Sequence, residues 1–103
     1  MTEQMTVLAK ARQGLGDDFH RWYDQVHIPE ILERYPEISS VVRYRLNPTL
    51  NHRVQDLHDS AAVYEVNGSA AALWQRLLSD TTMTAGTGFD YKRTLVMFSS
   101  PST

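Results

Sequence analysis

The chain has 103 residues, of which 42% are hydrophobic and 10% aromatic. This length predicts a single domain over residues 1–103 with an ordinary hydrophobic core, and it is too short for two domains. Lys and Arg total 10 against 12 for Asp and Glu, and neither sign forms a run, which argues against a nucleic-acid or anionic-membrane partner. We therefore expect a small-molecule substrate or a protein as the partner.

The sequence contains no cysteine, so disulfides, thiolate catalysis and zinc–cysteine sites are excluded. Its apolar runs are far shorter than the roughly 20 residues that span a bilayer, and the polar start MTEQ is unlike a signal peptide. These features predict a cytoplasmic protein. The pieces GLG and GTG lack the strand, helix and spacing of a nucleotide-binding fingerprint, so no cofactor is expected.

The chain begins with a predicted strand. Residues 5–11 (MTVLAKA) form a short apolar run that indicates a strand, and the sequence GLGDD at 14–18 ends it. Asp17 or Asp18 is then expected to cap a helix, because negative charge is favourable at a helix start.

The helix that follows carries more chemistry than any other stretch, over residues 19–32 (FHRWYDQVHIPEIL). Pro29 lacks an amide proton and pushes the preceding residue away from helical geometry. We therefore expect the helix to run to about His27, with a kink or a second short turn over residues 29–34.

A helical projection gives this segment an apolar stripe with an ionisable edge. The stripe, which we expect to face the core, consists of Phe19, Trp22, Tyr23 and Val26. The edge is formed by His20, Asp24 and His27. Side chains at such an edge pass from packed interior to solvent, so these three are candidates for the mouth of a pocket.

The rest of the chain predicts three more strands and a second helix. Residues 38–46 alternate between two faces, which marks a strand, and residues 61–66 predict the next one. A helix over residues 70–78, capped by the Asn-Gly-Ser turn before it, and a last strand over residues 91–99 follow. The polar segment 47–59 predicts a long loop that could act as a lid or lie flat on the surface.

Two further segments are expected to lie at the surface. Residues 81–87, within the Thr/Gly loop at 80–88, are expected at the surface, and the Ser/Pro/Thr tail at 100–103 is expected to fray. His52 and His58, in the long polar loop, are also expected at the surface.

The resulting order is βαββαβ, which predicts an α+β, ferredoxin-like fold: a four-stranded antiparallel sheet with both helices on one face. The other face should be polar in a monomer, yet the last strand places Leu95 and Met97 on one face and Val96 and Phe98 on the other. Monomers seldom leave such a patch exposed. We therefore predict a homodimer through the open face of the sheet.

His27 is the leading catalytic candidate, as a general acid or base with an unperturbed pKa of about 6.5. The alternative is a histidine that caps carbonyl groups freed at the helix break. Asp24, one turn away, would orient His27 and raise its pKa, against the opposing effect of burial, or else it is a solvated helix residue or part of a salt bridge. His20 could complete a metal set with these two, but three residues on one straight helix rarely converge on one ion, so no metal is expected.

The remaining candidates would bind substrate or steady charge. Arg43 could hold a carboxylate or enolate, although an edge-strand arginine in water is more common. Tyr23 could steady an oxyanion and needs a hydroxyl partner if buried. Trp22 is more often core than ligand contact, while Tyr44 and Tyr64 could stack on an aromatic substrate or simply pack under the helices. His20 completes the substrate-binding candidates.

The string WYDQVHIPEIL, followed by RYRL in the next strand, resembles the EthD-like group of dimeric α+β barrel proteins. The first helix of that group carries a Trp-Tyr, an acidic or polar residue and then His-(Leu/Ile)-Pro. The resemblance implies a dimer in which each subunit holds a pocket between helices and sheet, near His27. Relatives with this barrel include cofactor-free cyclases and dehydratases of aromatic polyketides, lactone isomerases, quinone-forming monooxygenases, haem-degrading enzymes and proteins with no known activity.

The sequence thus favours a cofactor-independent enzyme that cyclises, dehydrates or isomerises an aromatic or polyketide-like substrate. His27 would move the proton, Asp24 would orient it, and Arg43 or Tyr23 would steady the oxyanion. Two alternatives stay open: a cofactor-free monooxygenase of phenolic substrates, and a non-catalytic small-molecule-binding protein.

Overall fold

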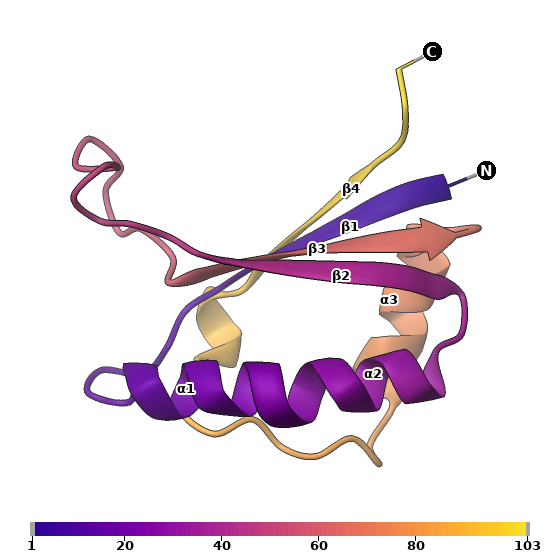
Figure 1. The fold of residues 1–103 in the computed structure, drawn as a ribbon, viewed down its shortest axis with the longest axis horizontal. Helices are drawn as coiled ribbons and strands as arrows, with labels where there is room; N and C mark the ends of the chain where they lie inside the picture. Colours follow the sequence, from indigo (N-terminus) through magenta and orange to yellow (C-terminus); the bar gives the residue numbers. More distant parts are fainter. Residues whose placement is uncertain (1, 103) are drawn as a thin grey trace.

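The computed structural model describes residues 2–102 and has the predicted α+β, ferredoxin-like architecture. A layer of helices covers one face of a single antiparallel sheet with the strand order β2-β3-β1-β4 (Figure 1). The strands are β1 (Thr2–Ala9), β2 (Ile38–Arg45), β3 (Ser60–Asn67) and β4 (Leu95–Ser99). Met1 and Thr103, the last residue of the tail that we expect to fray, lie outside the described range. Within that range, none of the helices has the length and apolar character needed to cross a bilayer.

The first helical segment is one continuous rod below the sheet in Figure 1. It consists of α1 (Gly16–Trp22), a π-helical turn η1 (Tyr23–His27) and α2 (Ile28–Arg34). The predicted aspartate cap is wrong: Leu15 occupies the N-cap position, and Asp17 and Asp18 lie in the first turn, where their charge still favours the helix. The helix begins early because the Leu15 amide already closes a turn onto the carbonyl of Arg12.

Pro29 does not break this rod, contrary to the prediction. Ile28 keeps helical angles, with φ −62° and ψ −48°, and its amide donates to the carbonyl of Tyr23, five residues earlier. In an α-helix the proline ring would clash with the carbonyl of Gln25, four residues before it. The wider π-turn removes that conflict and lets the helix continue.

The π-turn also changes which side chains face the sheet. Four inward positions, Phe19, Tyr23, His27 and Ile31, are spaced by four, and Trp22 beside them is also buried. Val26, which the regular helical projection placed in the core, is instead 36% exposed. The segment around His27 is therefore rotated relative to the prediction, because a π-turn holds one more residue than an α-turn.

The second helix, α3 (Ala70–Ser79), begins as predicted. The hydroxyl of Ser69 accepts a hydrogen bond from the amide of Ala72, which satisfies one of the free amides of the first turn.

The last strand is shorter than predicted. Residues 91–93 form a 3₁₀ turn, η2 (Tyr91–Arg93), and pairing with β1 begins only at Leu95 opposite Leu8. The chain before this turn still pairs with the residues that follow β1, because Phe89 bridges to Ala11 and the amide of Asp90 donates to the carbonyl of Lys10. The turn at Tyr91–Arg93 therefore interrupts the pairing and delays the start of β4.

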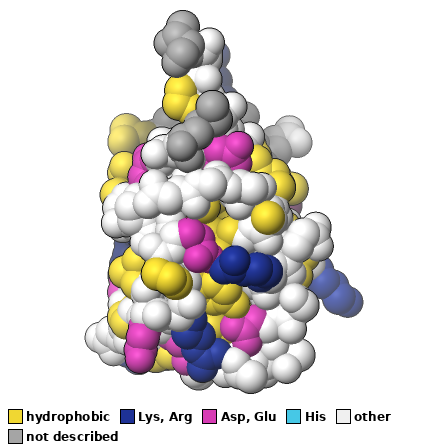
Figure 2. All heavy atoms as spheres, turned by 90° about the vertical axis from the view of Figure 1, so that its right-hand side faces the viewer, with side chains coloured by type: hydrophobic (Ala, Val, Ile, Leu, Met, Phe, Trp, Pro, Cys, Tyr) yellow, Lys and Arg dark blue, Asp and Glu magenta, His cyan; other side chains and the backbone are white. Residues whose placement is uncertain are grey.

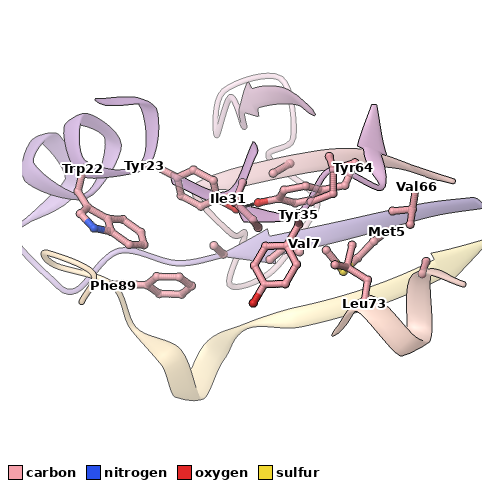
Figure 3. Close-up of a cluster of buried hydrophobic side chains, with 14 of the residues drawn as sticks. Met5, Val7, Trp22, Tyr23, Ile31, Tyr35, Tyr64, Val66, Leu73 and Phe89 are labelled. Carbon is pink, nitrogen blue, oxygen red and sulfur yellow. Dashed lines mark hydrogen bonds between the residues drawn. The ribbon is translucent and has the colours of Figure 1, made fainter. Parts of the chain in front are cut away.

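The hydrophobic core fills the space between the sheet and the helices (Figure 3). Met5 and Val7 on β1 and Tyr64 and Val66 on β3 point into it, and Leu73 closes it from α3. Burying a large apolar side chain contributes about 1.5–3 kcal/mol, so this cluster accounts for much of the stability of the fold.

Candidate functional site

A cavity of about 550 Å³ lies beside this core, between the helical layer and the sheet. This volume is within the range of small-molecule binding sites. Trp22, Tyr23 and His27 of the first helical rod line the cavity, together with Tyr64 of β3. Trp74 and Leu77 of α3 complete its apolar wall.

The structure divides the eight predicted site residues into two groups. Trp22, Tyr23, His27 and Tyr64 line the cavity. The other four are His20, Asp24, Arg43 and Tyr44, and none of them does. Tyr44 lies on the open face of the sheet and is 53% exposed, because its position in β2 alternates with the inward-facing Arg43.

His27 is packed between aromatic rings. Its ring stacks on Trp22 at a centroid distance of 4.7 Å and contacts the edge of Tyr23 at 5.0 Å. Its Nδ1 atom is buried without a hydrogen-bond partner among the described residues. Burial lowers the pKa of His27 to about 4, and the nearby charge of Glu30 opposes this shift only in part. His27 is therefore neutral at pH 7.

The predicted pairing of Asp24 with His27 is wrong, and so is the predicted rise in the pKa of His27. The Asp24 carboxylate binds Arg43, at 2.8 Å from Nε. The π-turn places the two side chains in different surroundings, so the carboxylate expected to stabilise the imidazolium is not available to it.

Tyr23 and Tyr64 meet at the cavity wall through their hydroxyl groups, which are 3.0 Å apart (Figure 3). Both rings are almost completely buried. Burial raises the pKa of Tyr23 to about 12 and raises the pKa of Tyr64 well above its usual value. Both hydroxyls therefore stay protonated, and they can donate hydrogen bonds over the whole physiological range of pH.

Arg43, His20 and Asp24 form a second, charged cluster. The guanidinium of Arg43 contacts Asp24, the Nδ1 atom of His20 at 2.8 Å and the hydroxyl of Ser60 at 3.2 Å. The Arg43 side chain is only 6% exposed, so the alternative of a solvated edge-strand arginine is wrong. Although β2 is an edge strand, α1 lies against its inner face and covers this position.

The electrostatics of this cluster keep His20 neutral. Burial lowers the pKa of His20, and the positive charges of Arg43 and Arg45 lower it further, against the opposing effect of Asp59 and Asp24. A neutral His20 can accept the hydrogen bond from Arg43 at Nδ1, whereas an imidazolium would repel the guanidinium.

Tyr23 connects the cluster to the cavity. The guanidinium carbon of Arg43 lies 5.0 Å from the centroid of the Tyr23 ring, within the range of a cation–π contact. Tyr23 also lines the cavity. Arg43 therefore holds a cavity residue in place without lining the cavity itself.

The loop over residues 80–88 lies largely at the surface, as the sequence predicted, and it also covers the cavity, which the sequence did not predict. Thr81, Met83 and Thr84 are cavity-lining residues. Glu30 of α2 fastens the loop by accepting hydrogen bonds from the amide of Thr84 at 2.7 Å and its hydroxyl at 2.8 Å, which lower the pKa of Glu30. The long loop at 47–59, proposed as a possible lid, contributes no cavity-lining residue.

Gly86 shows why this loop could have been recognised only with the structure. A Cβ atom at position 86 would lie 3.1 Å from the Trp22 ring and 2.9 Å from Cβ of Phe89. The loop thus packs directly on the first helical rod at a residue without a side chain. Sequence alone gives no periodic signal for such a contact.

Within residues 2–102, no group of three or more histidine, cysteine, aspartate or glutamate side chains is arranged to hold a metal ion. His20 and Asp24, two of the three residues weighed for such a site, bind the guanidinium of Arg43. Comparison with family models, curated proteins and solved structures gave no match to this chain.

Proposed function

We propose that the protein is a cofactor-independent enzyme that moves a proton on a small aromatic or polyketide-like substrate bound in the cavity. The observation that carries this proposal is His27, a neutral imidazole packed into the wall of an apolar cavity. Cyclisation, dehydration and isomerisation of such substrates all begin with removal of a proton beside a carbonyl group. A neutral histidine is a suitable base for that step.

In the proposed step, His27 takes a proton from the carbon next to a substrate carbonyl. Its Nδ1 is buried, so Nε2 is the nitrogen assigned to accept the proton. The electron pair of the broken C–H bond moves to the carbonyl oxygen and forms an enolate. A pKa of about 4 makes His27 a weak base on its own, but the enolate formed beside it stabilises the imidazolium.

Tyr23 and Tyr64 supply the second part of the mechanism. Their protonated hydroxyls lie at the cavity wall and can donate a hydrogen bond to the developing oxyanion. Arg43, expected from the sequence to steady the oxyanion, and Asp24, expected to orient His27, receive a different role here. The guanidinium of Arg43 contacts the ring of Tyr23 and positions it, and Asp24 in turn holds Arg43.

Deuterium exchange tests this mechanism. 1-Tetralone is a neutral aromatic ketone whose α-protons exchange slowly with D₂O, and NMR follows that exchange directly. We expect the protein to accelerate it, and His27→Gln to remove roughly 10²- to 10⁴-fold of the acceleration. His52→Gln, in the exposed loop at 47–59, is the matched control and should exchange at the parental rate. Equal exchange rates in the parent and in His27→Gln would show that His27 is not the base. Binding of 1-tetralone without faster exchange would identify a non-catalytic binding protein.

A homodimer is the second part of the proposal, because much of the open face of the sheet is apolar. The strand register places three rows of side chains across all four strands on that face, two of them largely apolar and one polar, formed by Ser40, Glu65, Gln4 and Ser99. The first apolar row is Val42, Val63, Thr6 and Met97, and the second is Tyr44, Ala61, Leu8 and Leu95. Leu95 and Met97 are 55% and 51% exposed within one subunit, and a second sheet packed on this face would bury them.

Light scattering at micromolar concentration tests the dimer. We expect a dimeric parent and a folded monomer for Met97→Glu, since a carboxylate would be buried without a partner at the centre of the interface. Leu32→Glu is the control, because Leu32 is 40% exposed on α2, a helix that lies on the side of the sheet away from the open face (Figure 1), and its variant should stay dimeric. A monomeric parent would contradict the sheet-to-sheet arrangement.

Membership of the EthD-like group is also part of the proposal, together with a cytoplasmic location. Support comes from the Trp22-Tyr23 and His27-Ile28-Pro29 motifs on the first helical rod and from the βαββαβ order of the fold. A solved structure of the protein as a barrel formed by two sheets would test the family, and cell fractionation would test the location.

A further inference from the structure

The charge around the cavity indicates which ligands it accepts. Among residues 2–102, none of the side chains lining the cavity is lysine or arginine. The ionisable residues other than tyrosines are His27, which is neutral, and Asp80. Hydrogen bonds from Thr82 and Tyr35 lower the pKa of Asp80 to about 2, so this residue carries a negative charge at pH 7.

Two arginines lie close to the cavity, and both are engaged by acidic side chains. Arg34 contacts Asp80 at 3.6 Å and Glu30 at 3.9 Å, and it also binds Thr82 in the loop that covers the cavity. Arg43 binds Asp24 on the far side of the Tyr23 ring. The cavity therefore offers an entering anion no cation in exchange for its hydration shell.

The same wall holds a hydrogen-bond donor. Tyr23 and Tyr64 share a single hydrogen bond between their hydroxyl groups, which uses one of their two O–H protons. The second proton has no acceptor among the described residues, and both hydroxyls stay protonated because burial raises the pKa of each tyrosine. A ligand oxygen can accept this proton without carrying a charge itself.

Stacked aromatic rings form other parts of the cavity wall. Trp22 and His27 stack with an interplanar angle of 26°, and Phe89 stacks on Tyr91 at 10° with a centroid distance of 4.4 Å. Aromatic faces in these orientations suit a planar ring system, which can pack against them in an offset or edge-on arrangement.

We infer that the cavity selects an uncharged, planar aromatic ligand that carries a carbonyl or phenolic oxygen, and that it rejects the corresponding carboxylates. The inference rests on the proposed use of the cavity as the substrate site and narrows the substrate to neutral aromatic ketones and phenols. The ligand oxygen accepts the free O–H proton of the Tyr23–Tyr64 pair. Its ring lies against the Trp22 and His27 side of the cavity.

A matched pair of ligands tests this inference. 2-Acetylnaphthalene and 2-naphthoate share one ring system. At pH 7.5 the first carries a neutral ketone and the second an ionised carboxylate. We expect NMR titration of the full chain to give binding at least roughly tenfold tighter for the ketone, because the carboxylate loses hydration without gaining a cation. The indole signal of Trp22 should shift with the ketone. Equal affinity, tighter binding of naphthoate, or no binding of either ligand overturns the inference.

A substitution at the cavity rim sharpens the test. Leu78 of α3 lines the cavity and is 61% exposed, so position 78 has room for a longer polar side chain. Figure 2 shows the end of the molecule that carries α3, where hydrophobic atoms lie between acidic and basic side chains. Leu78→Arg should raise the affinity for naphthoate relative to the ketone by roughly tenfold over Leu78→Gln, the size-matched neutral control. An unchanged ratio would mean that charge does not determine selection.

The two proposals fail separately. If naphthoate binds as tightly as the ketone while 1-tetralone exchange still depends on His27, the ligand class is wrong and the proton-transfer function stands. If the carboxylate is rejected while the exchange is the same in His27→Gln, the ligand class stands and the function is wrong.

Discussion

The two histidines of the first helical rod, His20 and His27, have opposite surroundings although they lie on the same helix. His20 belongs to a charged cluster and accepts a hydrogen bond from Arg43. His27 lies among aromatic rings, and its Nδ1 has no partner among the described residues. The pKa of each is lowered, that of His20 by burial and by two arginines and that of His27 by burial against the opposing charge of Glu30.

This difference arises from the π-turn between them. Residues seven apart lie on nearly the same face of a regular α-helix, so the sequence places both histidines along one edge. The turn at Tyr23–His27 holds one extra residue, which rotates His27 inward and leaves Asp24 with Arg43. One change in helical geometry thus separates a structural cluster from a candidate catalytic site.

The largest effect that we expect is the pH dependence contributed by His27. Its pKa is about 4 in the folded protein and about 6.5 when unfolded, so the unfolded chain binds the proton first as pH falls. The stability that neutral His27 confers is complete above pH 6.5 and is lost as pH falls through the folded pKa. Relative to the parent, His27→Gln should remove on the order of 3 kcal/mol from the change in unfolding free energy between pH 7 and pH 4.

Urea denaturation at a series of pH values measures this slope. His52→Gln should leave it as in the parent, since His52 is exposed in the 47–59 loop. A His27→Gln variant with the parental slope would show that the imidazole is solvated and that the two histidines do not differ as described.

Arg43→Ala, which disrupts the charged cluster, should lower the free energy of unfolding by about 3 kcal/mol. The substitution leaves His20 and Ser60 without their partner, while the half-exposed Asp24 can regain water, so the loss should lie at the lower end for a broken buried pair. Arg45→Ala, two residues along β2 at an exposed position, is the control and should change stability by less than about 0.5 kcal/mol. Similar losses in both variants would mean that the cluster contributes little.

Much of the fold could be predicted from the sequence because hydrophobic periodicity is a local signal. The alternation in residues 38–46 and the two-faced last strand required no knowledge of distant contacts, and the βαββαβ order followed from them. Element ends were less accurate, as the shortened β4 shows. Its start is set by the turn at Tyr91–Arg93, which separates the Ala11–Phe89 bridge from the Leu8–Leu95 pair, and the alternation within β4 does not reveal this interruption.

The candidate site was only half predictable. Trp22, Tyr23, His27 and Tyr64 were found because aromatic and ionisable residues on predicted inward faces are informative. The partners of these residues, such as that of Asp24, could not be predicted, since the π-turn has no signature in composition apart from Pro29. The cover formed by residues 80–88 also escaped prediction, because it is held by Glu30 through hydrogen bonds that no periodicity reveals.

The smallest effect concerns the boundary between the two regions, the hydroxyl pair of Tyr23 and Tyr64. Tyr64→Phe should cost about 1–2 kcal/mol, because it leaves the buried Tyr23 hydroxyl without its partner at 3.0 Å. Tyr23→Phe should cost a similar amount for the same reason. The double variant removes both polar groups together, so its loss should be smaller than the sum of the two by about 1 kcal/mol. Additive losses in urea denaturation would show that the two hydroxyls are hydrated independently, and the free O–H proton assigned to the ligand would then be bound to water instead.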